Sequence, residues 1–193
     1  MQTINEILAQ ELGQKQEYID NVVKLMDEGN TIPFIARYRK EMHGAMDDTT
    51  LRNLETRLTY LRNLQQRRDE VKKSIENQGK MTDELLLAID NASTMAEVED
   101  LYRPYKQKRR TRASIAREKG LEGLANIISL QMTDKSLEVE AESFLSAEKG
   151  VESVKDAIAG AMDIIAEMVS DDADYRKEIR ALTFKNGLLK SKA

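Results

Sequence analysis

A stretch from Asp47 to Gly79 constrains the fold most, because its roughly 30 residues predict one uninterrupted helix about 45 Å long. Apolar residues recur along it every three or four positions until an arginine pair interrupts them. These residues are Leu51, Leu54, Leu58, Leu61, Leu64, Val71 and Ile75. Asp47 can cap the first amide groups, and Gly79 is a typical stop signal. We therefore expect a long central helix over residues 47–79.

The spacing of this stripe argues against a dimeric coiled coil. Its seven-residue repeat fails after Leu61, where Leu64 follows by three, and too few heptads remain. We interpret the long helix as a spacer within one chain. This interpretation predicts that Leu58 and Leu61 are buried against helices of the same chain.

Composition favours an all-α fold for the 193 residues. The chain is 40% apolar and 33% charged, and it holds two prolines, 5% aromatic residues and no tryptophan, so strand signals are scarce. The absence of cysteine excludes disulfides and thiolate metal sites. The sequence also lacks a membrane-length apolar run and a signal-peptide pattern, so we expect a cytoplasmic protein.

Three short helices are predicted ahead of the long one. The first begins at the capping-box pair Thr3 and Glu6, and the second covers residues 15–28. The third is expected to begin after Thr31, which can cap it. We therefore interpret residues 1–46 as a helix-turn-helix-like helical unit.

Residues 80–193 are predicted to form a helical bundle. The stretch 121–132 is apolar enough to be largely buried, and residues 151–169 form an amphipathic pattern. Met162 and Met168 fall at helical spacing within that pattern and are expected in the core.

A basic segment, residues 103–119, is the strongest candidate binding site. The stretch 101–120 holds eight basic residues against Glu118 alone, a local charge of +7 within a chain of formal charge −4. Its bases are interleaved with tyrosines, a pattern that suits phosphate contacts and base stacking. The candidate nucleic-acid-binding residues here are Tyr105, Lys106, Lys108, Arg109, Arg110, Arg112 and Arg117. In the alternative interpretation, the tyrosines pack against helices and the arginines bridge to an adjoining acidic domain.

A second candidate lies in residues 31–40, where Arg37, Arg39 and Lys40 follow an expected helix start. These bases could hold a nucleic-acid backbone. In the alternative, Phe34, Ile35 and Tyr38 are core residues, while the bases are solvated or pair with Glu41 and other nearby acids. We favour this alternative from the sequence, because most surface charge is only solvated.

Catalytic patterns are weak, and we expect neither an enzyme nor a metal or cofactor. His43 is the only histidine, so a Ser-His-Asp arrangement would depend on one residue in a predicted loop. Three nearby acids, Asp171, Asp172 and Asp174, stand at a helix junction, where capping explains them better than metal binding. No glycine-rich phosphate loop or dinucleotide fingerprint is present.

Two stretches resemble a known family. They are TIPFIARYRKEMHG at Thr31–Gly44 and VEDLYRPYKQKRRTRASIAREKGLEGLA at Val98–Ala125. Together with the start of the long helix, EKGV at Glu148–Val151 and the closing LLKSK, they resemble the N-terminal region of the bacterial Tex family of transcription accessory proteins.

The resemblance implies a longer protein, of which this chain would be the N-terminal part. Family members continue into an RNase H-like domain, helix-hairpin-helix motifs and an OB-fold RNA-binding domain, none of which is in this sequence. The resemblance implies a non-catalytic module that assists RNA or DNA binding in transcription. Its expected partners are nucleic acid, the downstream domains and the transcription machinery, with no membrane. The alternative is a purely structural scaffold that docks the downstream domains and binds nothing alone.

Overall fold

The computed structural model describes residues 2–106 and 109–191. Their regular secondary structure is helical, and the only β-type pairing found in this part of the chain is an isolated antiparallel bridge between Ser146 and Val151. The predicted all-α class is therefore confirmed. The chain divides into two compact units, Met1–Ser74 and Ile75–Ala193, and each is described by itself.

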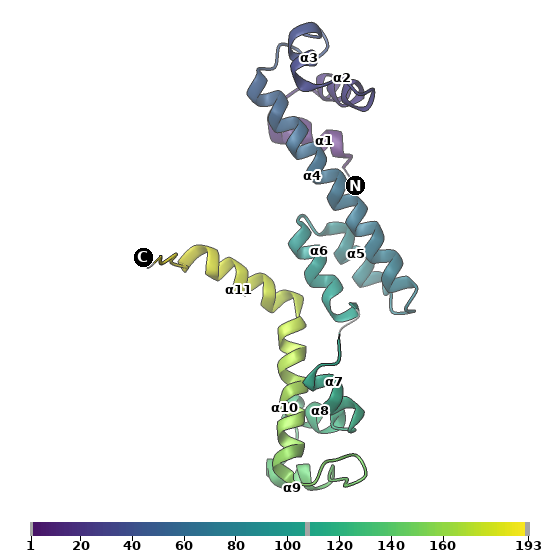
Figure 1. Ribbon diagram of the computed structural model, residues 1–193, viewed down its shortest axis with the longest axis vertical. Helices are drawn as coiled ribbons and strands as arrows, with labels where there is room; N and C mark the ends of the chain where they lie inside the picture. The colour runs from purple at the N-terminus through teal and green to yellow at the C-terminus, as the bar shows by residue number, and fades with distance from the viewer. Residues whose placement is uncertain (1, 107–108, 192–193) are drawn as a thin grey trace. The chain divides into compact units, whose positions relative to one another are not determined.

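The N-terminal unit is built from four helices (Figure 1). They are α1 (Ile4–Leu12), α2 (Gln16–Asp27), α3 (Ile32–Tyr38) and α4 (Asp48–Glu76). Local signals set their ends as predicted: the Thr3–Glu6 capping box opens α1, and Asp47 Oδ1 accepts a 2.7 Å hydrogen bond from the Thr50 amide at the start of α4. The Thr31 side chain makes no capping hydrogen bond at α3, so that expected cap is wrong in its side-chain detail.

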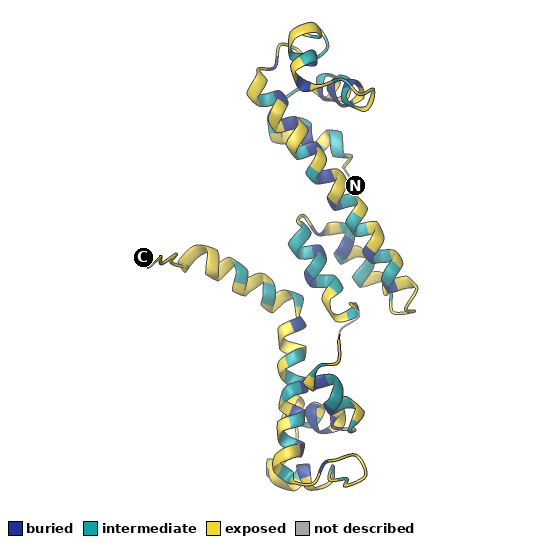
Figure 2. Cartoon of the chain, in the orientation of Figure 1, coloured by how far each residue is buried: buried dark blue, intermediate teal, exposed yellow. Residues whose placement is uncertain are grey.

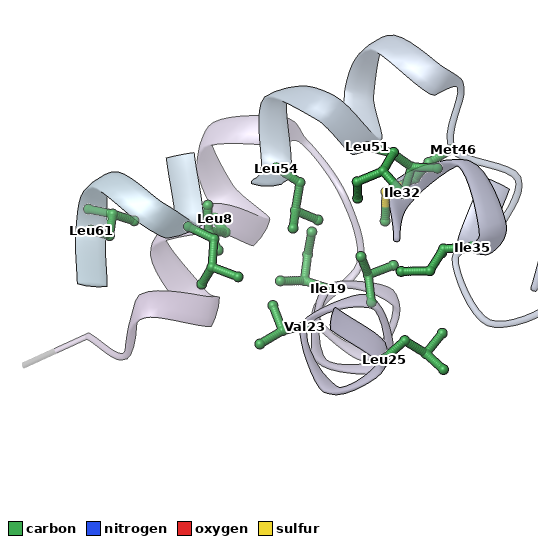
Figure 3. Close-up of a cluster of buried hydrophobic side chains, with 12 residues drawn as sticks. Leu8, Ile19, Val23, Leu25, Ile32, Ile35, Met46, Leu51, Leu54 and Leu61 are labelled. Atoms are coloured by element: carbon green, nitrogen blue, oxygen red, sulfur yellow. The ribbon is translucent and has the colours of Figure 1, made fainter. Parts of the chain in front are cut away.

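A single hydrophobic core holds this unit together, and Figure 3 shows side chains from all four helices converging in it. Leu58 and Leu61 of α4 are 2% and 6% exposed within this core, which confirms the prediction made for them. All seven residues of the predicted stripe on the long helix are buried. The helix is amphipathic as its spacing indicated, and Figure 2 shows the buried positions recurring along α4 between exposed ones.

The second unit contains the remaining helices. They are α5 (Asp83–Asn91), α6 (Met95–Tyr102), the short 3₁₀ helix η1 (Arg103–Tyr105), α7 (Arg112–Glu118), α8 (Glu122–Leu130), α9 (Leu137–Glu142), α10 (Val154–Asp171) and α11 (Ala173–Asn186). A second core joins α7, α8 and α9 to α10. At Gly160 of α10, an added Cβ would lie 2.4 Å from Leu121 Cδ1 and 3.3 Å from Ala116 Cβ, so only glycine permits this close approach.

Two predictions about burial in this unit are wrong. Met162 and Met168 are 61% and 47% exposed, because α10 packs through a narrow stripe of small residues that includes Ala157 and Ala161. The stretch 121–132 is buried only at its start, since its last residues lie beyond the packed face of α8. On α8 and α10, apolar residues therefore cover a wider face of the helix than the part that packs against neighbouring helices.

Helix α11 is attached to α6 mainly by charge. None of its residues is buried, and its Arg176 and Arg180 both donate to the Asp100 carboxylate of α6, with Arg176 Nε at 2.6 Å. Asp100 itself is only 4% exposed. No helix within 2–106 or 109–191 has the length and hydropathy needed to cross a membrane.

Candidate nucleic-acid interface

Four consecutive residues at the C-terminal end of α3 form what we call the α3 surface: Arg37, Tyr38, Arg39 and Lys40. Within the described part of the chain, none of its three bases forms an ion pair with a carboxylate. The Arg39 guanidinium donates to the Tyr38 carbonyl at 3.2 Å and lies 5.3 Å from the centroid of the Phe34 ring. Of the two possibilities in the alternative interpretation, pairing with Glu41 and nearby acids is not found among the described residues, whereas Arg37 and Lys40 are exposed to solvent as its other part expects.

Aromatic rings accompany these bases. Tyr38 is 56% exposed, so its predicted place in the core is wrong, whereas Ile35 is fully buried as predicted and Phe34 is half-buried. The Phe34 and Tyr38 rings lie 5.2 Å apart at an interplanar angle of 47°, and the Arg37 guanidinium is 6.0 Å from the Tyr38 centroid. Helix α3 ends at Tyr38, which leaves this side chain at the rim of the core rather than inside it.

The loop after α3 is attached to helix α2. Gly44 has φ +60°, and an added Cβ there would lie 2.2 to 2.7 Å from carbons of the Tyr18 ring. Asn21 of α2 donates to the Met42 carbonyl at 3.2 Å. His43 is 1% exposed, and neither of its ring nitrogens has a hydrogen-bond partner. The approach to Tyr18 and the Asn21–Met42 hydrogen bond therefore attach the loop that follows the α3 surface to α2.

The basic segment of the second unit differs, because two of its arginines are bound to α10. Arg103 Nε lies 2.8 Å from Asp171 Oδ1, and Arg117 Nη1 lies 2.6 Å from Glu167 Oε2. The Thr111 hydroxyl also donates to Glu167 at 3.0 Å. These two arginines therefore pair with acids of their own helical unit and not with an adjoining acidic domain, which the alternative interpretation expected.

The other described bases that pair with acids are more exposed, and two of the three pairs are longer than 3.5 Å. The nitrogen–oxygen distances are 3.7 Å for Lys106–Glu99, 2.9 Å for Arg110–Glu118 and 3.6 Å for Arg112–Asp163. Arg109 is exposed and has no ion pair with another described residue, while Lys108 lies outside the described residues. Tyr105 is half-buried, and its carbonyl accepts a 3.0 Å hydrogen bond from Gln78 Nε2.

An open groove of about 790 Å³ runs along this segment and carries both signs of charge. Its charged lining residues are Lys106, Arg109, Arg110, Arg117, Glu118, Glu167, Asp171 and Asp172. The sequence indicated the bases and Glu118 but not that acids of α10 lie beside them, because Glu167 and Asp171 are 50 and 68 residues away in the chain from their partners Arg117 and Arg103. The net field in this groove is therefore weaker than the local sequence charge suggests.

The acidic cluster at the α10–α11 junction has structural partners. Asp172 Oδ1 accepts hydrogen bonds from the amides of Asp174 and Tyr175 at 3.0 and 2.9 Å, which confirms the predicted capping. Asp171 binds Arg103 as described above. A search of the described residues finds no group of histidine, aspartate and glutamate side chains that could hold a metal ion.

Comparison of the sequence with known proteins identifies a family. The family description "Tex-like protein N-terminal domain" matches residues 2–76, and "Tex central region-like" matches residues 133–193. The chain belongs to the Tex family. The α3 surface lies inside the first matched range, whereas the basic segment lies between the two.

Individual relatives agree with this assignment. Protein YhgF of Escherichia coli is 49% identical over 96% of this chain, and the transcriptional accessory protein Tex of Neisseria gonorrhoeae is 45% identical over 92%. S1 RNA-binding domain-containing protein 1 of Homo sapiens is 35% identical over 86% of the chain. These alignments cover 24%, 23% and 16% of the three relatives, so the chain spans about a quarter of the length of its bacterial relatives.

Proposed function

We propose that this chain is a non-catalytic, cytoplasmic helical module that binds nucleic acid for a transcription accessory protein. The name of the Neisseria gonorrhoeae relative supports the role in transcription, and that of the human relative supports an association with RNA. The α3 surface is the principal contact in this proposal. Exposed bases of the basic segment contribute less.

The observation that carries the proposal is the absence of carboxylate partners around Arg37, Arg39 and Lys40 within the described residues. Cations without a carboxylate partner are available to contact phosphate and release its counterions, which makes binding salt-dependent. The buried Ile32 and Ile35 fix α3 in the core, so Arg37 projects from an anchored helix, and Arg39 and Lys40 follow directly after the last residue of that helix. Binding of this kind is weak and tolerant of sequence, because phosphate contacts carry no base information.

The experiment compares two variants that each lose three positive charges. The triple variant Arg37→Ala, Arg39→Ala, Lys40→Ala removes the bases of the α3 surface. Its matched control removes Arg109, Arg110 and Arg112 from the basic segment, two of which already have a carboxylate neighbour. Binding of each protein to fluorescein-labelled RNA and DNA is followed by anisotropy at two salt concentrations.

We expect the α3 variant to lose affinity at least tenfold and to reduce the slope of log K against log salt by about 2–3. The control should change the same slope by about 1 or less. Equal binding by the wild type and the α3 variant would remove the α3 surface from the proposal. A larger loss in the control would move the site to the basic segment.

One structural observation favours a second candidate function, a scaffold for downstream domains. The Arg103–Asp171 and Arg117–Glu167 pairs engage part of the basic segment within its own helical unit, which leaves fewer of its bases to contact nucleic acid. A pure scaffold predicts no salt-dependent binding of RNA or DNA by this chain. It also predicts binding in trans to the remainder of a longer family member.

A further inference from the structure

We infer that α11 joins two copies of this chain by packing antiparallel against α11 of a second copy. One exposed face of the helix makes the contact, and we call it the α11 face: Tyr175, Ile179, Leu182 and Asn186. The inference concerns a contact between proteins in the second unit, so it is independent of the proposed binding of nucleic acid.

The α11 face is a mainly apolar stripe that is uncovered in the single chain. Its members are separated by four, three and four positions, so they lie along one side of the helix. Tyr175, Ile179 and Leu182 are 52%, 63% and 62% exposed, and Figure 2 shows α11 exposed or intermediate along its length. Arg176 and Arg180, which bind α6, lie roughly a third of a turn around the helix from this stripe. Exposed apolar residues that adjoin one another are typical of protein interfaces.

The charged residues beside the stripe fit an antiparallel pair of identical helices. Glu178 and Lys185 flank it on the same side, seven residues or about two turns apart. Both are exposed, and neither forms an ion pair with another described residue. In an antiparallel pair, Glu178 of each copy lies beside Lys185 of the other, which gives two ion pairs. In a parallel pair, Glu178 faces Thr183 and neither lysine meets an acid, so the charges select the antiparallel orientation.

The antiparallel orientation also sets the register of the two helices. A twofold axis between residues 180 and 181 places Ile179 against Leu182 of the second copy, and Tyr175 against Asn186 of the second copy. The two aliphatic pairs then fill the middle of the contact. At each end, a tyrosine hydroxyl can form a hydrogen bond with an asparagine amide while both remain in reach of water.

An apolar groove lies where the residues that follow α11 in the second copy arrive. This open groove of about 600 Å³ is formed at the junction of α10 and α11, where Ala166, Val169 and Ile179 line it. In the antiparallel register, Leu188 and Leu189 of the second copy reach the N-terminal end of α11, next to the groove. Both leucines are exposed in the single chain, so their burial there adds to the contact.

The contact is small, because it uses about four turns of each helix. We therefore expect a weak dimer that forms at roughly tens to hundreds of micromolar, and a monomer at a few micromolar. Sedimentation equilibrium of the 193-residue chain between about 1 and 300 μM measures this association. The weight-average mass of the wild type should rise with concentration towards that of two chains.

Charge reversal tests the two ion pairs. Lys185→Glu sets an acid beside an acid at both flanks and should weaken the dimer roughly fivefold or more. Adding Glu178→Lys to this variant restores opposite charges and should return the dissociation constant to within about twofold of the wild type. The matched control is Lys155→Glu, which reverses an exposed lysine on α10 and should leave association unchanged.

Cross-linking reads the orientation directly, because the chain contains no cysteine. On oxidation with diamide, Tyr175→Cys and Asn186→Cys should form a disulfide-linked dimer when mixed and not when each is alone, since only the antiparallel register brings these positions together. A chain that stays monomeric at the highest concentration would overturn the inference and leave the α11 face to another occupant. A dimer that Lys185→Glu does not weaken, or variants that link only to themselves, would overturn it as well.

Discussion

Replacing Asp100 with asparagine should release α11 from the second unit. Asp100 is 4% exposed and accepts hydrogen bonds from Arg176 and Arg180, which stand four residues apart on one face of α11. Because α11 buries none of its own residues, few apolar contacts remain to hold it when these bonds weaken. The substitution keeps the shape of the side chain and removes its charge.

The expected loss of free energy that holds α11 in place follows from the two hydrogen bonds to Asp100. Each hydrogen bond between charged groups contributes about 1.5–3 kcal/mol, so two give roughly 3–6 kcal/mol. The two arginine side chains are 33% and 31% exposed, so water replaces part of what they lose, and we reduce the figure to about 2–3 kcal/mol. At 1.4 kcal/mol per factor of ten, opening of α11 should become about 30 to 150 times more frequent.

Hydrogen exchange of amides in α11 measures this opening directly. The matched control is Glu178→Gln, which removes one negative charge from an exposed residue of the same helix. Its exchange should stay within about threefold of the wild type, since surface substitutions have small effects. If Asp100→Asn exchanges no faster than this control, the carboxylate does not hold α11 and the reasoning fails.

The same contact predicts a dependence on pH. Burial alone would raise the pKa of Asp100, but hydrogen bonds from Arg176 and Arg180 outweigh it and hold this pKa below its ordinary value. A carboxyl group with a lowered pKa in the folded state stabilises that state above its unfolded pKa of about 4. The stabilisation is lost as the pH falls through the folded pKa. Protection of α11 should therefore decrease in acid in the wild type and change much less in Asp100→Asn.

Two further substitutions test the N-terminal unit. Leu58→Ala should lower the free energy of unfolding of this unit by about 2–5 kcal/mol, because Leu58 is 2% exposed in the core. As a control, Leu87→Ala replaces a leucine of the second unit that is 61% exposed, and it should change the urea midpoint of that unit little. Gly44→Ala should cost about 2–4 kcal/mol, since it combines a φ of +60° with a clash against the Tyr18 ring. Gly13→Ala has φ +62° and nothing within 4 Å, so its cost should be only about 1–2 kcal/mol. Similar losses for both glycines would show that the ring contact is unimportant.

Local sequence signals predicted much of the fold. The capping pair Thr3–Glu6 and the stripe on the long helix were identified correctly, because each depends on residues three or four positions apart. Burial was predicted less well where it depends on which face of a helix packs against its neighbours. Met162 has the right spacing for a core residue, yet it faces solvent because α10 contacts its neighbours through smaller side chains.

For the candidate site, too, the sequence predicted the residue types better than their contacts and burial. The sequence ranked the segment that contains Arg117 above the one that contains Arg37, whereas in the structure Glu167 binds Arg117 and no carboxylate pairs with Arg37 among the described residues. The exposure of Tyr38 was missed because it follows the buried Ile35 by three positions, the usual spacing of one helix face. Its position at the last residue of α3 was the one available signal against burial.

The arginine pairs of the basic segment also bear on how fast a charged ligand arrives. An ion pair such as Arg117–Glu167 has no net charge, so beyond a Debye length of about 8 Å it contributes little field. The same holds for Arg103–Asp171. Long-range steering of a polyanion is consequently weaker at this segment than its composition suggests, and association there depends on direct encounter. At the α3 surface, by contrast, the on-rate for a polyanion should rise as salt is lowered.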